Sequence, residues 1–208
     1  MKKFTMFNKG LLIVVSGPSG AGKGTICSAY LERNPHAMLS VSVTTRKPRI
    51  GEKEGKNYFF RDKETFLKMV EDGEFLEYAE VYGNYYGTPK KFVEEELAAG
   101  NDVILEIDIQ GALQVKERFP EAVFVFIIPP SMEELKRRIV KRGTEDAEAI
   151  YRRFQSAYEE LNYISRYNYV IINDTVESAV AKLEAIVLAE KCRVDRNKQL
   201  YLELTGRG

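Results

Sequence analysis

A glycine-rich segment near the start of the sequence carries residue types that bind phosphate. Residues 17 to 25 read Gly-Pro-Ser-Gly-Ala-Gly-Lys-Gly-Thr, after an apolar run and before a helical pattern. Glycines let successive backbone N–H groups turn inward, and the start of a helix adds unpaired N–H groups and the positive end of its dipole. Lys23 adds a positive charge for the outer phosphates of a triphosphate. The pattern favours such a cradle, a P-loop, over a glycine-rich turn without a ligand.

The end of this segment departs from the usual P-loop, in which Ser or Thr directly follows the lysine and holds Mg²⁺. Gly24 stands at that place, and Thr25 comes next. We therefore expect Mg²⁺ to be bound mainly through nucleotide phosphates and water, and we predict no metal site made of protein residues. The segment as a whole is predicted to contact ATP, through Gly17, Pro18, Ser19, Gly20, Ala21, Gly22, Lys23, Gly24 and Thr25.

A second set of polar residues could hold a phosphate and a purine base. Arg46 and Arg49 lie three residues apart, and each guanidinium group could take two phosphate oxygens. Tyr58 and Tyr86 add hydroxyl donors. Guanine presents two donors on one edge, and a carboxylate such as that of Glu77 could accept both. Taken singly, the arginines could instead be solvated charges, and the tyrosines could be ordinary strand residues.

These residues and their neighbours together resemble the guanylate kinase family from about residue 11 to residue 188. The segments that carry the resemblance are 42–49, 55–58, 75–79, 83–88, 108–111 and 142–145. The resemblance implies direct in-line transfer of a phosphoryl group from ATP to GMP, and also to dGMP, with release of ADP. It also implies that Arg46, Arg49, Tyr58 and Tyr86 hold the acceptor phosphate, and that Glu77, Ser42 and Thr88 read the base.

Arginines are concentrated in one short region further along the chain, at 137, 138, 142, 152 and 153. The pair at 143–144 interrupts two helical patterns and indicates a hinge or loop tip. Cations on a closing segment would stabilise the moving phosphoryl group and exclude water. The alternative is an exposed basic helix face paired with nearby glutamates. By resemblance the lid arginines are Arg138, Arg142 and Arg153, so the predicted catalytic residues are Lys23, Arg46, Arg138, Arg142 and Arg153.

Polar residues also follow two of the apolar runs. Glu106 and Asp108 alternate at the end of a run, so both should lie on one face at the carboxyl end of a strand, where open α/β sheets bind ligands. We predict substrate contacts for both, with Asp108 accepting from the base or from water around the metal. Asn173 follows the last run and is predicted to line the adenine pocket. Alternatively, the pair Asn173 and Asp174 caps the next helix, a role that suits Asp174.

Four nearly continuous apolar runs predict strands of a buried parallel sheet: 11–15, 103–107, 123–128 and 170–172. Helical patterns between them, beginning at 23–33, predict an α/β fold of the P-loop NTPase type with helices on both faces. The segment 37–95 is rich in Tyr, Gly and β-branched residues. It predicts an inserted small mixed α/β sub-domain for the nucleoside monophosphate. The core would comprise 10–36 and 96–190, with a helical lid at about 138–155 and a charged tail at 191–208.

Composition restricts the function classes. The chain has 31 Lys plus Arg and 31 Asp plus Glu, so no overall field attracts nucleic acid or an anionic membrane. Two cysteines and no run of membrane-spanning length favour a cytoplasmic protein, which we expect to be a monomer or homodimer. Two alternatives to the GMP kinase remain. One is an inactive binding module of the same shape, against which Lys23 and its glycines argue; the other is a kinase with a different phosphorylated acceptor.

Overall fold

The computed structural model describes residues 9–141 and 147–206, and within them the larger part is a parallel five-stranded sheet. Its strand order is β2 (Ala37–Leu39), β7 (Asp102–Glu106), β1 (Leu12–Ser16), β8 (Val123–Ile128) and β9 (Tyr169–Ile172). Strands β1, β7 and β8 are buried on both faces over almost their whole length, which explains why their sequences read as continuous apolar runs. The predicted α/β fold is confirmed.

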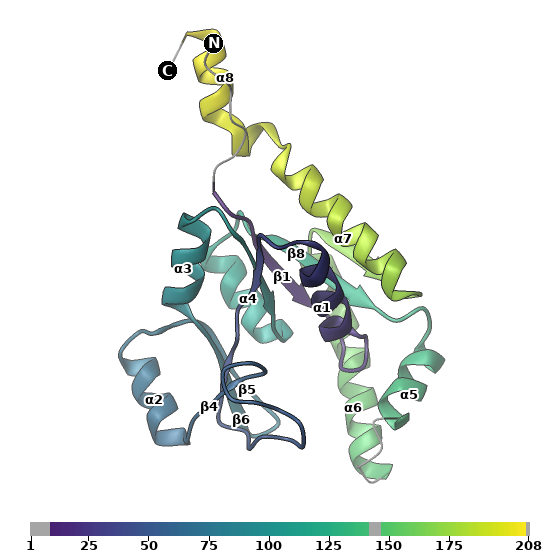
Figure 1. The fold of residues 1–208 in the computed structure, drawn as a ribbon. Helices are drawn as coiled ribbons and strands as arrows, with labels where there is room; N and C mark the ends of the chain where they lie inside the picture. The colour runs from purple at the N-terminus through teal and green to yellow at the C-terminus, as the bar shows by residue number, and fades with distance from the viewer. Residues whose placement is uncertain (1–8, 142–146, 207–208) are drawn as a thin grey trace.

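Helices cover both faces of this sheet (Figure 1). On one face α1 (Lys23–Arg33) and α7 (Val176–Lys191) enclose a core that includes Ile26 and Leu183. On the other face α3 (Lys90–Ala98) and α4 (Ile109–Arg118) enclose a second core. The sheet is thus held between two apolar layers, which leaves the carboxyl ends of its strands as the place for polar chemistry.

The inserted sub-domain is a mixed four-stranded sheet with one helix, within the part of the chain that the structure describes. Its strand order is β4 (Phe59–Phe60), β3 (Val43–Thr44), β6 (Asn84–Pro89) and β5 (Phe75–Val81), and α2 (Lys63–Glu71) packs against it. Phe66 of α2 is fully buried and stacks on Phe75 with ring centroids 4.6 Å apart. The sub-domain therefore has an apolar core of its own.

The start of this insertion differs from the predicted boundary at residue 37. Strand β2 lies inside the predicted segment 37–95, yet it pairs with β7 as the edge strand of the core sheet. The first strand of the sub-domain sheet is β3, which comprises only Val43–Thr44. The short β2 carries no long apolar run, so its pairing partner could not be recognised from sequence pattern alone.

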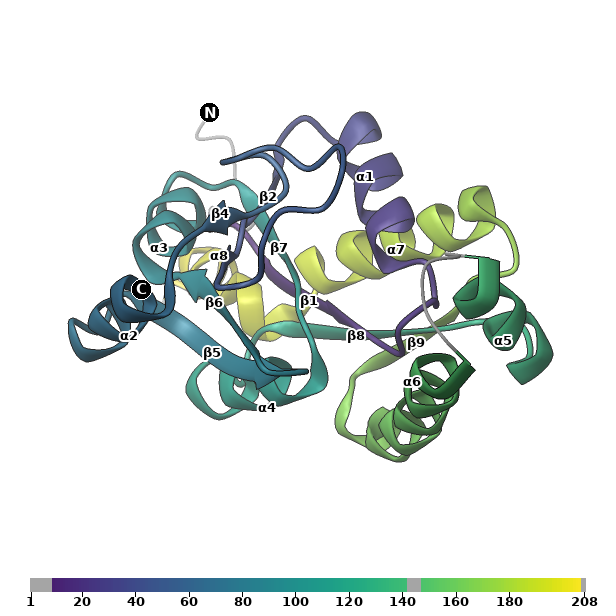
Figure 2. The ribbon, with the colours of Figure 1, turned by 90° about the horizontal axis from the view of Figure 1, so that it is seen from below.

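Two further helices lie on the other side of the core from the sub-domain, as both views show (Figures 1 and 2). They are α5 (Met132–Lys141) and α6 (Ala147–Glu160), followed by the 3-10 segment η1 (Leu161–Arg166). Ser131 precedes α5 and caps its start, because its hydroxyl accepts from the Glu134 N–H at 3.1 Å. Leu135, Ile139 and Ala157 are buried where the two helices meet.

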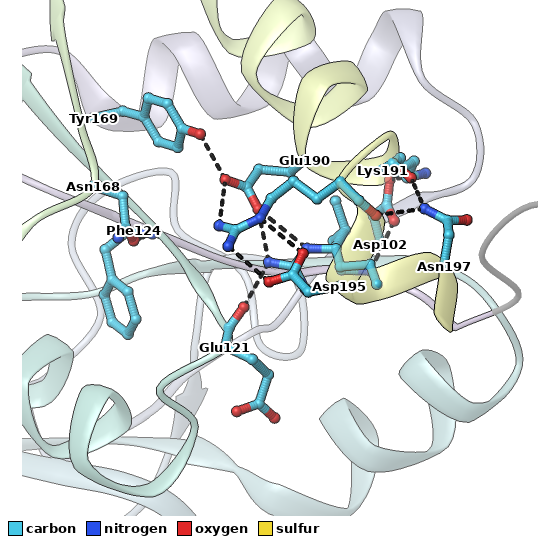
Figure 3. Close-up of polar contacts among 12 residues, drawn as sticks. Asp102, Glu121, Phe124, Asn168, Tyr169, Glu190, Lys191, Asp195 and Asn197 are labelled. Carbon is cyan, nitrogen blue, oxygen red and sulfur yellow. Dashed lines mark hydrogen bonds and ion pairs between the residues drawn. The ribbon is translucent and has the colours of Figure 1, made fainter. Parts of the chain in front are cut away.

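The end of α7 is fixed by a charged network (Figure 3). Glu190 is buried, accepts from the Tyr169 hydroxyl at 2.6 Å and pairs with Arg196 at 2.8 Å. Lys191 pairs with Asp102 at 2.6 Å, at the start of β7. The charged tail continues as the 3-10 segment η2 (Val194–Asn197) and as α8 (Lys198–Thr205), which projects from the body in Figure 1. No helix among the described residues has the length and apolar character needed to cross a membrane.

Candidate active site

A cavity of about 710 Å³ lies at the carboxyl ends of β1 and β7. Its lining comes from the P-loop, the inserted sub-domain, the end of β7 and the end of α6. The lining residues that the sequence predicted are Gly17, Ser19, Gly20, Gly22, Lys23, Gly24, Ser42, Arg46, Arg49, Tyr58, Glu77, Tyr86, Glu106 and Asp108. Residues from segments far apart in the chain therefore meet around one space large enough for a ligand.

The P-loop connects β1 to α1, as the strand-to-helix pattern predicts. The Lys23 ammonium group donates to the carbonyls of Gly17 at 2.5 Å and Pro18 at 3.2 Å. Gly22 has φ +91°, a conformation that favours glycine. The loop thus surrounds Lys23 with backbone groups at the start of a helix, an arrangement suited to anions.

Two side chains support this loop from behind. Asn173 is buried and its amide donates to the Ala21 carbonyl at 2.7 Å. Arg138 of α5 donates to the carbonyls of Ala21 at 3.3 Å and Asn173 at 3.2 Å. A Cβ on Gly22 would lie 2.3 Å from the Asn173 amide nitrogen, so any side chain at position 22 would break this support. Asn173, predicted to line an adenine pocket, contacts the loop itself and does not line the cavity.

The helix cap after β9 differs from the sequence expectation. Thr175, and not Asp174, caps α7, because its hydroxyl accepts from the Ser178 N–H at 3.2 Å. Asp174 instead accepts from the N–H of Thr175 at 2.8 Å. Both residue types form caps, and sequence alone could not decide which of the two neighbours occupies the position before the first turn.

Position 24 has a structural reason to be glycine. A Cβ built there would stand 3.3 Å and 3.4 Å from the two carboxylate oxygens of Glu106. The Glu106 side chain therefore fills the space beside the loop that a Ser or Thr side chain would enter. Thr25 is exposed, and it does not line the cavity. Pro18 and Ala21 also lie outside the lining, although Ala21 accepts the two supporting hydrogen bonds.

The two predicted phosphate-binding arginines share one carboxylate. Glu52 pairs with the Arg46 guanidinium at 2.8 Å and accepts from the backbone N–H of Arg49, also at 2.8 Å. The hydrogen bond that the Arg46 guanidinium donates to Glu52 raises the pKa of Arg46. Burial alone would raise the pKa of Glu52, but the hydrogen bonds from both arginines lower it. Glu52 was not among the predicted site residues, and its sequence signal is weak, because the same loop also contains the acidic Glu54.

Aromatic rings also help to hold the Arg46 side chain in position. Its guanidinium carbon lies 5.3 Å from the centroid of the Tyr58 ring, and Tyr58 meets Tyr86 edge to face at 5.9 Å. Burial raises the pKa of the Tyr58 hydroxyl, with a further contribution from the charge of Glu106. The Tyr58 hydroxyl thus remains a protonated donor at neutral pH. The three residues form one preorganised wall of the cavity.

Glu77 is a buried carboxyl group at the other end of the cavity. It is only 3% exposed, and the Thr88 hydroxyl donates to its Oε1 at 2.5 Å. Burial raises its pKa to about 7, and the Thr88 hydrogen bond opposes this shift. A Cβ on Gly111 would lie 2.3 Å from Glu77 Oε2, so α4 approaches the carboxyl group as closely as glycine permits. Thr88 is fully buried and supports Glu77, but it does not line the cavity. Ser42, the other hydroxyl residue predicted to read the base, does line the cavity.

Glu106 and Asp108 both line the cavity, as expected for alternate residues at a strand end. Asp108 is the N-cap of α4, and its Oδ1 accepts from the N–H groups of Gln110 at 2.7 Å and Gly111 at 3.2 Å. A ligand role was predicted for Asp108, but this capping role was not. The cap sets the direction of α4 and hence the approach of Gly111 to Glu77.

Other lining residues were not predicted: Val81, Tyr82, Asn84, Ile107 and Glu160. Glu160 ends α6 and accepts from the Ser156 hydroxyl at 3.2 Å. Burial raises its pKa, and the charge of Lys23 opposes that shift. Of the predicted lid arginines, Arg142 lies outside the described residues. Arg153 lies in α6, with its side chain outside the described part.

Comparison with known proteins relates this chain to a single family. The sequence model of the family described as guanylate kinase matches residues 9–190. The guanylate kinase of Caldanaerobacter subterraneus subsp. tengcongensis is 66% identical over 196 residues, covering 94% of this chain and 95% of that protein. A Clostridium perfringens guanylate kinase is 62% identical over 203 residues, covering 98% and 94%. The crystal structure of guanylate kinase from Anaplasma phagocytophilum has a TM-score of 0.81 and 37% identity, covering 98% of each chain. This chain therefore belongs to the guanylate kinase family.

Proposed function

We propose that this enzyme transfers the γ-phosphoryl group of ATP to the phosphate of GMP, or of dGMP, and releases ADP. The observation that carries the proposal is that Lys23 and Glu77 line the same cavity. A triphosphate on the loop and a guanine at Glu77 would place their phosphates between these two ends. The acceptor phosphate is already ionised, so the reaction needs alignment and charge stabilisation but no covalent enzyme intermediate.

The residues divide into three roles. The P-loop amides and Lys23 hold the triphosphate, and Arg46, Arg49, Tyr58 and Tyr86 hold the acceptor phosphate. Glu77 reads the base by accepting the two guanine donors, while adenine would leave this buried carboxyl group unpaired. Ser42 lies in the cavity wall and could meet the O6 side of guanine. Thr88 acts through Glu77.

Arginines of the lid form the last part of the proposal. Arg138 already contacts the loop backbone. We propose that Arg138, Arg142 and Arg153 together stabilise negative charge on the phosphoryl group as it is transferred. Asn173 and Arg138 hold the loop in shape, so we assign Asn173 an indirect role in binding ATP.

Mg²⁺ is the metal that this chemistry uses, and its charge would neutralise the phosphates. Among the residues that the structure describes, no group of three or more His, Cys, Asp or Glu side chains could hold a metal. The carboxylates of Glu106 and Asp108 nevertheless line the cavity, and Glu106 lies beside Gly24. We propose that the ion is carried by nucleotide phosphates and water, with Glu106 and Asp108 accepting hydrogen bonds from that water.

The two free cysteines fit a reducing cytoplasm, where we place the enzyme.

The experiment is a coupled assay of ADP release with GMP, dGMP, AMP and UMP as acceptors. We expect turnover with the two guanine nucleotides and little with the others. Lys23→Ala should lose turnover by roughly a thousandfold while GMP binding by calorimetry survives. Lys91→Ala is the matched control, because Lys91 is 88% exposed on α3. Full turnover by Lys23→Ala, or equal use of AMP, would contradict the proposal.

A further inference from the structure

Strand β5, which carries Glu77, lies at the edge of the sub-domain sheet as far as the described residues show. It pairs with β6 on one side only, so half of its backbone groups face away from that partner. The pairing also shifts register between Phe75 and Glu77, which leaves Leu76 outside the regular ladder. A residue that must hold its carboxyl group in a fixed position therefore stands on a weakly supported stretch of strand.

Two side chains of α4 supply the missing support. The Gln114 amide nitrogen donates to the Tyr78 carbonyl at 2.7 Å, and the Gln114 carbonyl oxygen faces the Tyr78 N–H at 3.4 Å. Gln114 thus offers β5 a donor and an acceptor, as a neighbouring strand would. Arg118 donates to the Leu76 carbonyl at 2.6 Å. The residues held, Leu76 and Tyr78, are the two neighbours of Glu77 in the chain.

The same helix controls the surroundings of the Glu77 side chain. Gly111 abuts its carboxyl group, and Arg118 lowers its pKa through charge, against the larger effect of burial. The Leu76 side chain is buried in the core cluster that contains Ala112 and Val115 of α4. Backbone and side-chain contacts therefore both tie this part of β5 to α4.

We propose that Gln114 and Arg118 are specificity-determining positioning residues, which hold Glu77 in place by gripping the backbone on either side of it. We call these contacts the β5 clamp. The inference rests on the proposed function, in which Glu77 reads guanine. Among the residues that the structure describes, the hydrogen bonds of the clamp go to Leu76 and Tyr78 and not to the P-loop or the acceptor-phosphate residues. Loosening it should therefore affect base recognition and spare ATP binding.

The test variant is Gln114→Met, which keeps the volume and removes both polar groups. We expect the KM for GMP to rise by about fivefold, as for loss of one or two ordinary hydrogen bonds, with kcat and the KM for ATP unchanged. IMP lacks the exocyclic amine and forfeits one hydrogen bond to Glu77. The preference for GMP over IMP should therefore shrink in Gln114→Met. Arg118→Met should act in the same direction, and Glu117→Ala, at an exposed position between them, is the control.

A double-mutant cycle with Glu77→Gln decides whether the clamp acts through Glu77. In the Glu77→Gln background, Gln114→Met should have no further effect on the KM for GMP. A persisting effect, an equal rise of both KM values, or an unchanged preference for GMP over IMP would each overturn the inference. If Glu77→Gln itself leaves that preference unchanged, the base-reading role fails first. If Glu77→Gln abolishes the preference and Gln114→Met leaves it intact, the clamp alone is wrong.

Discussion

A carboxylate oxygen of Glu106 lies only 3.3 Å from the position that a Cβ would take on Gly24. This spacing is tighter than ordinary van der Waals contact, so a Ser or Thr at position 24 would require the Glu106 carboxylate to shift. The enzyme has an oxygen-bearing side chain beside the loop, but that side chain comes from the end of β7 and not from the first turn of α1.

Restoring the usual loop residue should therefore harm the enzyme. We expect Gly24→Thr to lower kcat/KM for ATP by about tenfold or more, because the branched side chain must displace Glu106. The KM for GMP should stay close to that of the parent enzyme. The informative partner is Gly24→Thr combined with Glu106→Ala, which removes the collision. Steady-state kinetics should show that Gly24→Thr lowers kcat/KM for ATP by a smaller factor in the Glu106→Ala background than in the parent enzyme, and an equal factor in both would disprove the steric explanation.

The raised pKa of Glu77 predicts a pH dependence of GMP recognition. Its folded-state pKa of about 7 lies above the usual 4.5, so the group binds a proton as the pH falls through 7. Guanine donors need the charged form, so the KM for GMP should rise by up to about tenfold per pH unit below 7. The KM for ATP should not follow this profile. Kinetics from pH 5.5 to pH 8.5 would measure both.

The matched control for this profile is Glu77→Gln, because the phosphate of GMP also titrates, with a pKa near 6. Any pH dependence left in Glu77→Gln belongs to the phosphate and is subtracted. If the profile for GMP were the same with and without the carboxyl group, Glu77 would not be the titrating residue.

The hydroxyl of Thr88 should tune this titration. Thr88→Val keeps the shape but removes the hydrogen bond that lowers the pKa of Glu77. Burial would then be opposed less, only by the backbone N–H of residue 88 and the charge of Arg118. The pKa of Glu77 should therefore rise above its present value, and the loss of GMP affinity should begin at a higher pH. The same kinetic profile checks this, with Thr65→Val on the exposed end of α2 as a control that leaves the curve unchanged. If the loss of GMP affinity in Thr88→Val began at a lower pH instead, the predicted direction of the Glu77 pKa change would be wrong.

Local patterns carried much of the sequence-based prediction. The P-loop could be predicted because its strand, loop and helix are contiguous, and the core strands at 103–107 and 123–128 match the structure to within one residue at each end. Arg46, Arg49, Tyr58, Glu77 and Tyr86 were predicted by resemblance, and all line the cavity.

Residues that act on other residues could not be predicted. Gln114 looks like an ordinary helix surface residue, and its contact exists only because β5 presents an open edge to α4. Asn173 reads as a pocket or capping residue, yet it meets a carbonyl 152 positions earlier in the chain. Such contacts depend on tertiary placement, which residue type and spacing do not contain.

Glu52 provides the final prediction, because one carboxylate holds the guanidinium of Arg46 and the backbone N–H of Arg49, the two arginines proposed to bind the acceptor phosphate. Glu52→Gln keeps the size and removes the charge, so a single amide oxygen must serve both donors. The Arg46–Glu52 side chains are only 14% and 18% exposed, so screening weakens this pair less than a surface pair. We expect the KM for GMP to rise by about tenfold, with the KM for ATP unchanged.

The comparison that isolates this effect is Glu54→Gln in the same loop. Glu54 also pairs with an arginine, Arg61, at 2.7 Å, but these side chains are 54% and 37% exposed and lie outside the cavity lining. Glu54→Gln should change neither the KM for GMP nor the KM for ATP by more than about twofold, because exposed ion pairs contribute little. Equal effects of the two substitutions in steady-state kinetics would mean that Glu52 only stabilises the loop. A selective rise for Glu52→Gln would establish that the carboxylate aligns Arg46 and Arg49 for the acceptor phosphate.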